Sequence, residues 1–183
     1  MTEKEKQQAG ELYDVRDREL ADKRNNIKKL CTEYNLAPYN DFQKKERLLD
    51  RIVALKGENI VVEPGFVCEY GYNIIIGDNF YAGHNFMVLD SAEIVFGDNV
   101  FIGSNCSIYT DVRPMDAETR NKGLKMAKPV KIGSNVSIGD NVAVMPGVTI
   151  GDNVVIESGS MIFEDIPSDS FASGNPCKVI KKI

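Results

Sequence analysis

The stretch KIGSNVSIGDNVAVMPGVTIGDNVVI, residues 131–156, repeats one pattern every six residues. A β-branched apolar residue leads each hexad, and glycine usually follows it. The lead residues continue to position 162: Ile132, Ile138, Val144, Ile150, Ile156 and Ile162. A period of six is neither the 3.6 of an α-helix nor the 2 of an alternating strand. The pattern therefore indicates a short strand and a sharp corner, repeated along the chain.

Two further series carry the same pattern toward the N-terminus. One comprises Ile76, Ala82, Val88 and Ile94, and the other, shifted by two residues, comprises Phe96, Ile102 and Ile108. A second apolar position follows four residues after many lead residues: Phe80, Phe86, Val100, Cys106, Val136, Val142, Val148 and Val154. One hexad cannot bury its own apolar residue, so hexads must stack. With three hexads to a coil, we expect about five coils of a hexapeptide-repeat parallel β-helix.

The triplet GDN or GSN recurs six times in phase with the repeat, at 77–79, 97–99, 103–105, 133–135, 139–141 and 151–153. Asp-x-Asn also occurs in calcium loops, but such a loop needs more oxygen ligands and a closing glutamate. Gly, Asp and Asn tolerate the backbone conformations of tight corners. We therefore predict that the triplets form corners, and we predict no metal site.

Residues 1–57 predict helices. Thr2 and Glu5 have the spacing of a capping box, Asp41 is placed to cap a later helix, and Gly57 is placed to end it. The residues expected on the inward faces are Leu20, Ile27, Leu30, Cys31 and Tyr34, then Phe42, Leu48, Leu49, Ile52 and Val53. The expected organisation is a helical segment at 1–57, a solenoid at 58–166 and a tail at 167–183. A polar excursion, TDVRPMDAETRN at 110–121, interrupts the repeat, so a loop is expected at about 109–129.

Composition excludes several classes of protein. The net charge of −5 argues against nucleic acid as a partner, which would require a basic face. No apolar run approaches the roughly 20 residues that span a bilayer, and the charged N-terminus lacks the apolar core of a secretory signal. Four scattered cysteines without a CxxC motif favour reduced thiols in a cytoplasmic protein.

Five segments together resemble the maltose/galactoside O-acetyltransferase family, acyl-CoA-dependent enzymes built on a left-handed β-helix. They are AGELYD (9–14), GENIVVEPGFVCEYGYNIIIGDNFYA (57–82), DAETRNKGL (116–124) with KPVKIG (128–133), PGVTIGDNVVI (146–156), and DIP (165–167) with GNPCKVI (174–180). The resemblance covers nearly the whole chain. It implies a mainly β, left-handed parallel β-helix with an N-terminal helical segment and an extruded loop, assembled as a homotrimer with each active site between two subunits.

The resemblance also implies a reaction. A histidine on the extruded loop removes the proton of a sugar hydroxyl, and the oxygen attacks the thioester of acetyl-CoA directly. The cosubstrate lies along the outside of the coils, and its phosphates lie near basic residues of the tail. The candidate cofactor contacts are Gly139, Ser158, Lys178 and Lys181.

The loop departs from the family pattern at its central residue. The family reads T-x-x-H-P, and this chain reads Thr110-Asp111-Val112-Arg113-Pro114. Arginine has no acceptor nitrogen and stays protonated, so Arg113 cannot be a general base. Losing that base typically lowers the rate about 10²- to 10⁴-fold. Glu164, where the family carries lysine, and Gly83, where it carries asparagine, also depart from the pattern.

Other side chains are candidates for the missing functions. His84 is the only histidine, and histidine is the most frequent general base in enzymes, although an exposed corner histidine is the simpler interpretation. The candidate acceptor contacts are Tyr81, Asn85, Asp90 and Asp111. Tyr81 is equally explained by packing, Asp90 by a corner and Asp111 by a solvated loop.

Three functions remain open from the sequence. The first is an acetyl-CoA-dependent O-acetyltransferase that acts on a hydroxyl of a sugar or related small molecule. The second is a catalytically impaired CoA- or sugar-binding pseudoenzyme on the same scaffold, suggested by Arg113, Gly83 and Glu164 together. The third is a solenoid that serves only as an assembly module.

Overall fold

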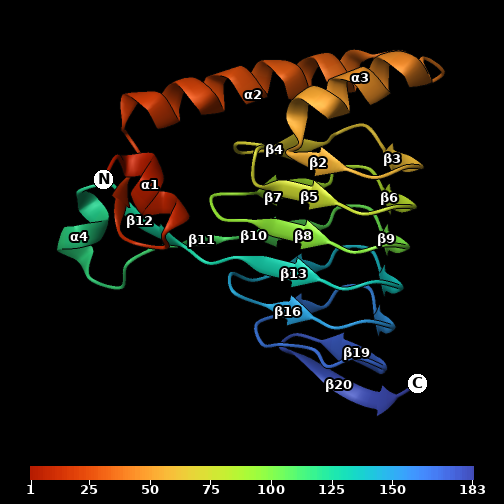
Figure 1. Cartoon of the computed structure of the whole chain (residues 1–183). Coiled ribbons are helices and arrows are strands. Elements are labelled where there is room, and N and C mark those ends of the chain that lie inside the picture. The colour runs from red at the N-terminus through yellow and green to blue at the C-terminus, as the bar shows by residue number, and fades with distance from the viewer.

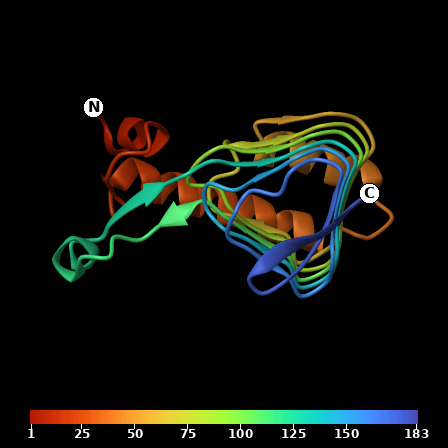
Figure 2. The same cartoon turned by 90° about the horizontal axis from the view of Figure 1, so that it is seen from below.

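The computed structural model describes residues 1–183, and most of the chain is a triangular solenoid (Figures 1 and 2). Each coil contributes one short strand to each of three parallel sheets, which we call faces I, II and III. Face I contains β4 (Val67–Cys68), β7 (Met87–Leu89), β10 (Ser107–Tyr109), β15 (Ala143–Val144) and β18 (Met161–Ile162). Face II contains β2 (Leu55–Lys56), β5 (Ile74–Ile76), β8 (Ile94–Phe96), β13 (Val130–Ile132) and β16 (Thr149–Ile150).

Face III is the longest sheet and ends in a hairpin. It contains β3 (Ile60–Val62), β6 (Phe80–Ala82), β9 (Val100–Ile102), β14 (Val136–Ile138), β17 (Val154–Ile156), β19 (Ser170–Gly174) and β20 (Cys177–Lys182). All neighbours are parallel except β19 and β20, which are antiparallel. The three faces thus have five, five and six parallel levels, which agrees with the predicted number of coils.

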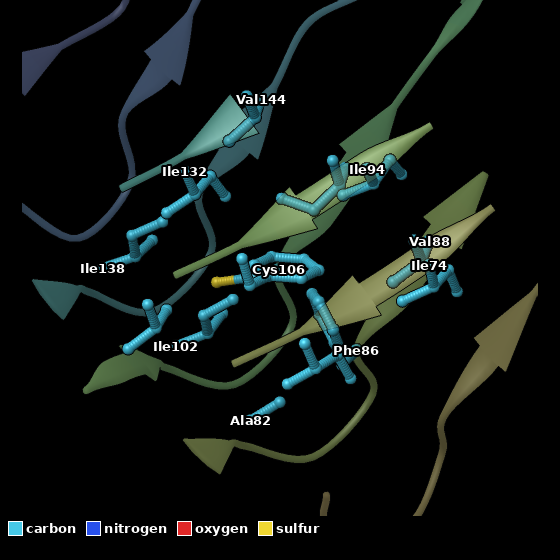
Figure 3. Close-up of a cluster of buried hydrophobic side chains, with 14 of the residues drawn as sticks. Ile74, Ala82, Phe86, Val88, Ile94, Ile102, Cys106, Ile132, Ile138 and Val144 are labelled. Atoms are coloured by element: carbon cyan, nitrogen blue, oxygen red, sulfur yellow. The ribbon is translucent and has the colours of Figure 1, made fainter. Parts of the chain in front are cut away.

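The hexad residues form the core. Every lead residue of the three series is buried, and so is every second apolar position. They belong to one continuous cluster of 36 buried residues, part of which is drawn in Figure 3. In Figure 3, Ile102 and Ile138 come from stacked strands of face III, and Ile94 and Ile132 come from stacked strands of face II. The predicted core is therefore confirmed.

The two-residue phase shift in the sequence has a structural cause. Ile76 pairs with Phe96, and Phe80 pairs with Val100, so these coils are 20 residues long. Later coils are 18 residues long, as in the pairing of Val136 with Val154. The longer coils have extra residues at the corner from face I to face II, which includes the buried polar residues Asp90, Ser91 and Thr110.

The triplets occupy the other two corners, as predicted. The asparagine that ends each triplet has a positive φ between 53° and 57°. These side chains also bond to one another from coil to coil, as Asn79 Nδ2 does to Asn99 Oδ1 at 3.0 Å. Glycine is required by close approach, because a Cβ on Gly77 would lie 2.6 Å from the carbonyl oxygen of Gly97. Repetition of these contacts aligns the coils.

Helices cover the first coil (Figure 1). The covering helices are α2 (Arg18–Leu36) and α3 (Phe42–Ile52), whereas α1 (Glu3–Gln8) lies to the side, next to the extruded loop. The capping box of Thr2 and Glu5 is present, and Asp41 caps α3. Two expectations were wrong. Phe42 is 75% exposed, because it begins α3 at the rim of the solenoid, and α3 ends at Ile52, while Gly57 forms a solenoid corner against Asp78. No helix has the length and apolarity needed to cross a membrane.

The extruded loop leaves the solenoid at the corner between faces I and II (Figure 2). It comprises β11 (Asp111–Val112), α4 (Ala117–Asn121) and β12 (Leu124–Ala127). β12 pairs antiparallel with β11 on one side and with β1 (Tyr13–Asp14) on the other. Across the loop, Phe96 pairs with Ile132, so one coil spans 36 residues without disturbing the stack.

Asp90 holds the corner beneath this loop. Its carboxylate accepts hydrogen bonds from the backbone N–H groups of Glu69, Tyr70 and Asn73 at 3.0, 2.8 and 3.4 Å. The side chain is fully buried. Burial raises the pKa of Asp90 to about 7, although the backbone donors act in the opposite direction. Since the folded pKa lies above the ordinary value, Asp90 stabilises the fold most at acid pH.

We therefore predict that Asp90 makes the stability fall as pH rises from about 4 to about 7, and that the effect is complete above pH 7. Urea unfolding of the wild type and Asp90→Asn should show a difference in unfolding free energy that changes over this window by up to about 4 kcal/mol. Asp98→Asn, at an exposed corner, is the matched control. A difference between wild type and Asp90→Asn that is independent of pH would contradict the prediction.

Candidate active site

The structure places the predicted site residues in two separate groups. The corner group lies on face III and on the corner from face III to face I: Tyr81, His84, Asn85, Gly139, Ser158, Lys178 and Lys181. The loop group lies at the corner from face I to face II: Asp90, Asp111 and Arg113. Strand β7 separates the two corners, and the five residues from Asn85 to Asp90 span about 16 Å. A single chain therefore does not bring the two groups together.

The members of this group that lie at the corner, from His84 to Ser158, belong to a straight column. Three backbone hydrogen bonds of 2.8 Å connect successive coils here. The backbone N–H of Asn105 donates to the carbonyl of His84, that of Asn141 to the carbonyl of Ser104, and that of Gly159 to the carbonyl of Asp140. Coils are about 4.8 Å apart, so the column runs about 14 Å from the level of His84 to that of Ser158. An elongated ligand that lies along the column would pass several backbone and hydroxyl groups in succession.

Gly139 and Ser158 are in contact within this column. The backbone N–H of Asp140 donates to Ser158 Oγ at 2.9 Å, and a Cβ on Gly139 would lie 2.5 Å from the same oxygen. Only glycine fits at position 139 with the coils this close. The two predicted cofactor contacts thus form one small, polar corner.

His84 is exposed at the N-terminal end of the column. Its side chain is 61% accessible, and Nε2 lies 3.9 Å from the Glu63 carboxylate. Asn85 has φ 59° and donates from Nδ2 to Asn105 Oδ1 at 2.9 Å, so its amide nitrogen belongs to the corner ladder. Tyr81 stacks on Phe101 with ring centroids 5.0 Å apart. Of these three side chains, His84 has the atoms most available to a ligand.

The tail lysines differ in their surroundings. Lys178 Nζ lies 2.7 Å from Glu164 Oε2, so Glu164 already neutralises it. Lys181 lies over the ring of Phe171, 5.6 Å from its centroid, and it has no ion pair. Both residues belong to β20, which extends face III next to the Ser158 corner.

The loop group contains a polar cluster that the sequence did not reveal. Ser91 Oγ lies 2.8 Å from Asp111 Oδ1 and 2.9 Å from Glu69 Oε2. Lys125 Nζ bonds to Asp111 and lies 3.9 Å from Glu69 Oε1. Ser91 and Asp111 are 20 residues apart, the length of the longer coils, and that spacing was the available signal. Arg113 is exposed beyond this cluster and has no hydrogen bond or ion pair within the chain.

Burial governs proton affinity in this cluster. The pKa of Glu69 is raised, first by burial and then by the charge of Asp111. Burial lowers the pKa of Lys125, but Asp111 and Glu69 outweigh it, and the net shift is upward. The Tyr13 hydroxyl and the Gln7 amide nitrogen are buried without hydrogen-bond partners.

A cavity of about 420 Å³ lies elsewhere, between α3 and β3. Tyr39, Phe42 and Val61 are among its exposed lining residues, and no predicted site residue lines it. Its lining also includes the charged residues Lys45, Glu46, Lys56 and Glu63 but no histidine, so it is a groove of mixed apolar and charged character.

Three family models match this chain. The maltose acetyltransferase hexapeptide capping motif matches residues 6–57, the hexapeptide repeat of succinyl-transferase matches 94–112, and the bacterial transferase hexapeptide of six repeats matches 129–164. A Saccharomyces cerevisiae protein, whose name assigns it provisionally to the acetyltransferases, is 49% identical over 175 residues, covering 95% of this chain and 89% of its own length.

Solved structures agree along the whole chain. A maltose O-acetyltransferase from Clostridium difficile 630 superposes with a TM-score of 0.97 at 46% identity, covering 100% of this chain and 98% of its own. A galactoside acetyltransferase in complex with coenzyme A superposes with a TM-score of 0.96 at 40% identity, covering 100% and 92%. The predicted left-handed parallel β-helix is confirmed, and the chain belongs to the maltose/galactoside O-acetyltransferase family of hexapeptide-repeat acetyltransferases.

Proposed function

We propose that this protein is an acetyl-CoA-dependent O-acetyltransferase that acts on a hydroxyl of a sugar or related small molecule, as a homotrimer. The separation of the corner group from the loop group is the observation that supports it best. Because one chain holds the two groups about 16 Å apart, a working site needs the corner of one copy and the loop of another. The relative bound to coenzyme A supports an acyl-CoA cosubstrate. A cytoplasmic location remains a prediction.

The outer surface of face III supports self-association. Val61, Phe101 and Val155 point outward in register and are 49%, 48% and 37% exposed. Tyr81 and Phe171 belong to the same row, in which Ser137, between Phe101 and Val155, is the one polar residue. An apolar stripe of this kind is typical of an interface between proteins. It runs beside the corner group, so a neighbouring copy on this face would bring its loop toward that group.

The proposed reaction forms one bond and breaks another. The acceptor oxygen attacks the thioester carbonyl, the C–S bond breaks, and the acceptor proton leaves with CoA as its thiol. Arg113 does not accept that proton, but its guanidinium has five donors and suits the oxyanion that forms during attack. His84 is the proposed proton acceptor, since it is the exposed imidazole of the corner group.

A histidine on the loop should add a base at the position where the family carries one, in addition to the proposed base His84. We expect wild-type protein to release CoA slowly from acetyl-CoA in the presence of a sugar acceptor. Arg113→His should raise that rate about 100-fold, because general-base assistance is typically worth 10² to 10⁴. Arg113→Gln, which removes the charge without adding a base, is the control, and a thiol assay gives the rate.

The second candidate function is the CoA- or sugar-binding pseudoenzyme. The ion pair of Lys178 with Glu164 favours the pseudoenzyme, because Lys178 is a lysine predicted to bind phosphate and Glu164 already occupies it. A small gain from Arg113→His, together with intact CoA binding, would favour this candidate. Absence of acceptor-dependent CoA release from both proteins would reject the transferase proposal.

Cofactor affinity should depend on the same ion pair. Glu164→Gln frees Lys178, and we expect CoA to bind about two- to fivefold more tightly, the scale of an exposed ion pair. Lys178→Gln should weaken binding by a similar factor, and added salt should reduce both effects. Calorimetry measures the dissociation constants, with Lys131→Gln on face II as the control. Equal CoA affinity in the wild type and all three variants would show that the CoA phosphates do not bind at Lys178.

A further inference from the structure

Four polar side chains join the extruded loop to the solenoid. Glu69 and Ser91 lie on successive coils at the corner from face I to face II, and Asp111 and Lys125 lie on the two strands of the loop. Ser91 is fully buried, and the other three side chains are only partly accessible: 17% for Glu69, 13% for Asp111 and 17% for Lys125. These contacts therefore link the outgoing and returning strands to the coil beneath them.

The number of protons in this cluster follows from geometry. The Ser91 hydroxyl is within hydrogen-bond distance of two carboxyl oxygens, 2.9 Å to Glu69 and 2.8 Å to Asp111. A hydroxyl has one proton to donate, so the second contact needs a proton on a carboxyl group. Asp111 already accepts from the Lys125 ammonium, whereas Glu69 Oε1 lies 3.9 Å from it. The geometry therefore favours Glu69 as the site of the extra proton.

The surroundings agree with this assignment. Burial is the main cause that raises the pKa of Glu69, and Asp111 adds to it, while Lys125, Ser91 and Arg24 act against them. The groups that face Glu69 come from every element around it. They are Arg24 of α2, Tyr13 of β1, Cys68 of β4, Tyr70 after β4, Asp90 after β7, Asp111 of β11 and Lys125 of β12. Arg24 is partly engaged with the Tyr70 hydroxyl at 2.6 Å.

We propose that Glu69, Ser91, Asp111 and Lys125 form a one-proton latch that positions the extruded loop, and with it Arg113, against the solenoid. Loss of the Glu69 proton leaves two carboxylates facing one hydroxyl, so one of the two contacts becomes repulsive. Since Asp111 is two residues before Arg113, release of this contact changes where Arg113 sits. Glu69 and Lys125 are thus positioning residues for the proposed reaction.

The direction of the pH effect is fixed. A folded-state pKa above the ordinary 4.5 means that the latch is intact at low pH and weakens as pH rises through that raised value. Other contacts also hold the loop. They include the short pairing of β1 with β12, the hydrogen bond from Arg16 to the Lys122 carbonyl and the hydrogen bond from the Val15 backbone N–H to the Gly123 carbonyl.

Hydrogen exchange of the loop amides tests the latch without any substrate. In wild-type protein, the protection of residues 111–127, corrected for intrinsic exchange, should fall at least about tenfold between pH 5 and 9. Glu69→Gln is isosteric with the protonated acid, so its loop should stay protected across this range. Lys125→Met should lower protection at every pH, because Asp111 loses its cation.

The controls separate the latch from general unfolding. Amides of residues 130–156 should keep their protection in all variants, and Glu93→Gln, at an exposed position of the same corner, should behave as wild type. Loop protection that does not change with pH in wild type, or that changes equally in Glu69→Gln, would overturn the proposal. If Lys125→Met does not fold, the comparison of wild type with Glu69→Gln still decides it. Neither outcome depends on whether the protein transfers acetyl groups.

Discussion

The backbone of each coil hydrogen-bonds in register to the coils on either side, and this ladder constrains every other feature of the molecule. Each side chain must pack against the side chain 18 or 20 positions along the chain, because the two stack directly, and this limits which residues each position accepts. At the triplet corners the chain must turn with a positive φ and with almost no room for a Cβ, so asparagine and glycine recur there. The column from His84 to Ser158 results from the same stacking of coils in register.

The corner from face I to face II escapes this constraint. Two extra residues there allow buried polar groups, and a much larger insertion forms the loop without breaking the ladder on either side. Asp90 satisfies backbone donors of the preceding coil, and Ser91 connects that coil to Asp111. Polar chemistry therefore gathers at the one corner where the repeat is relaxed, which is a physical reason for the loop to start there.

The sequence predicted the solenoid well, because a hexad series reports burial directly. Ile132 to Ile162 are all buried, and Thr2 and Asp41 cap helices as their spacing indicated. Local patterns were misleading at the ends of elements. Phe42 falls at the spacing of the buried helix face but lies at an exposed rim, and Gly57 forms a corner of the solenoid and does not end α3. The cluster of Glu69, Ser91 and Lys125 was missed because Lys125 reaches it on the returning strand of the loop, whose pairing the hexad pattern does not report.

The central claim is that the corner of one copy and the loop of another make the acetyl-transfer site. A crystal structure with bound acetyl-CoA tests it most directly. The account predicts a trimer in which the cosubstrate lies along the Gly139 and Ser158 corner, with its thioester facing Arg113 of a neighbouring copy. Acetyl-CoA bound with its thioester beside Arg113 of the same chain, or bound away from this corner, would contradict the account.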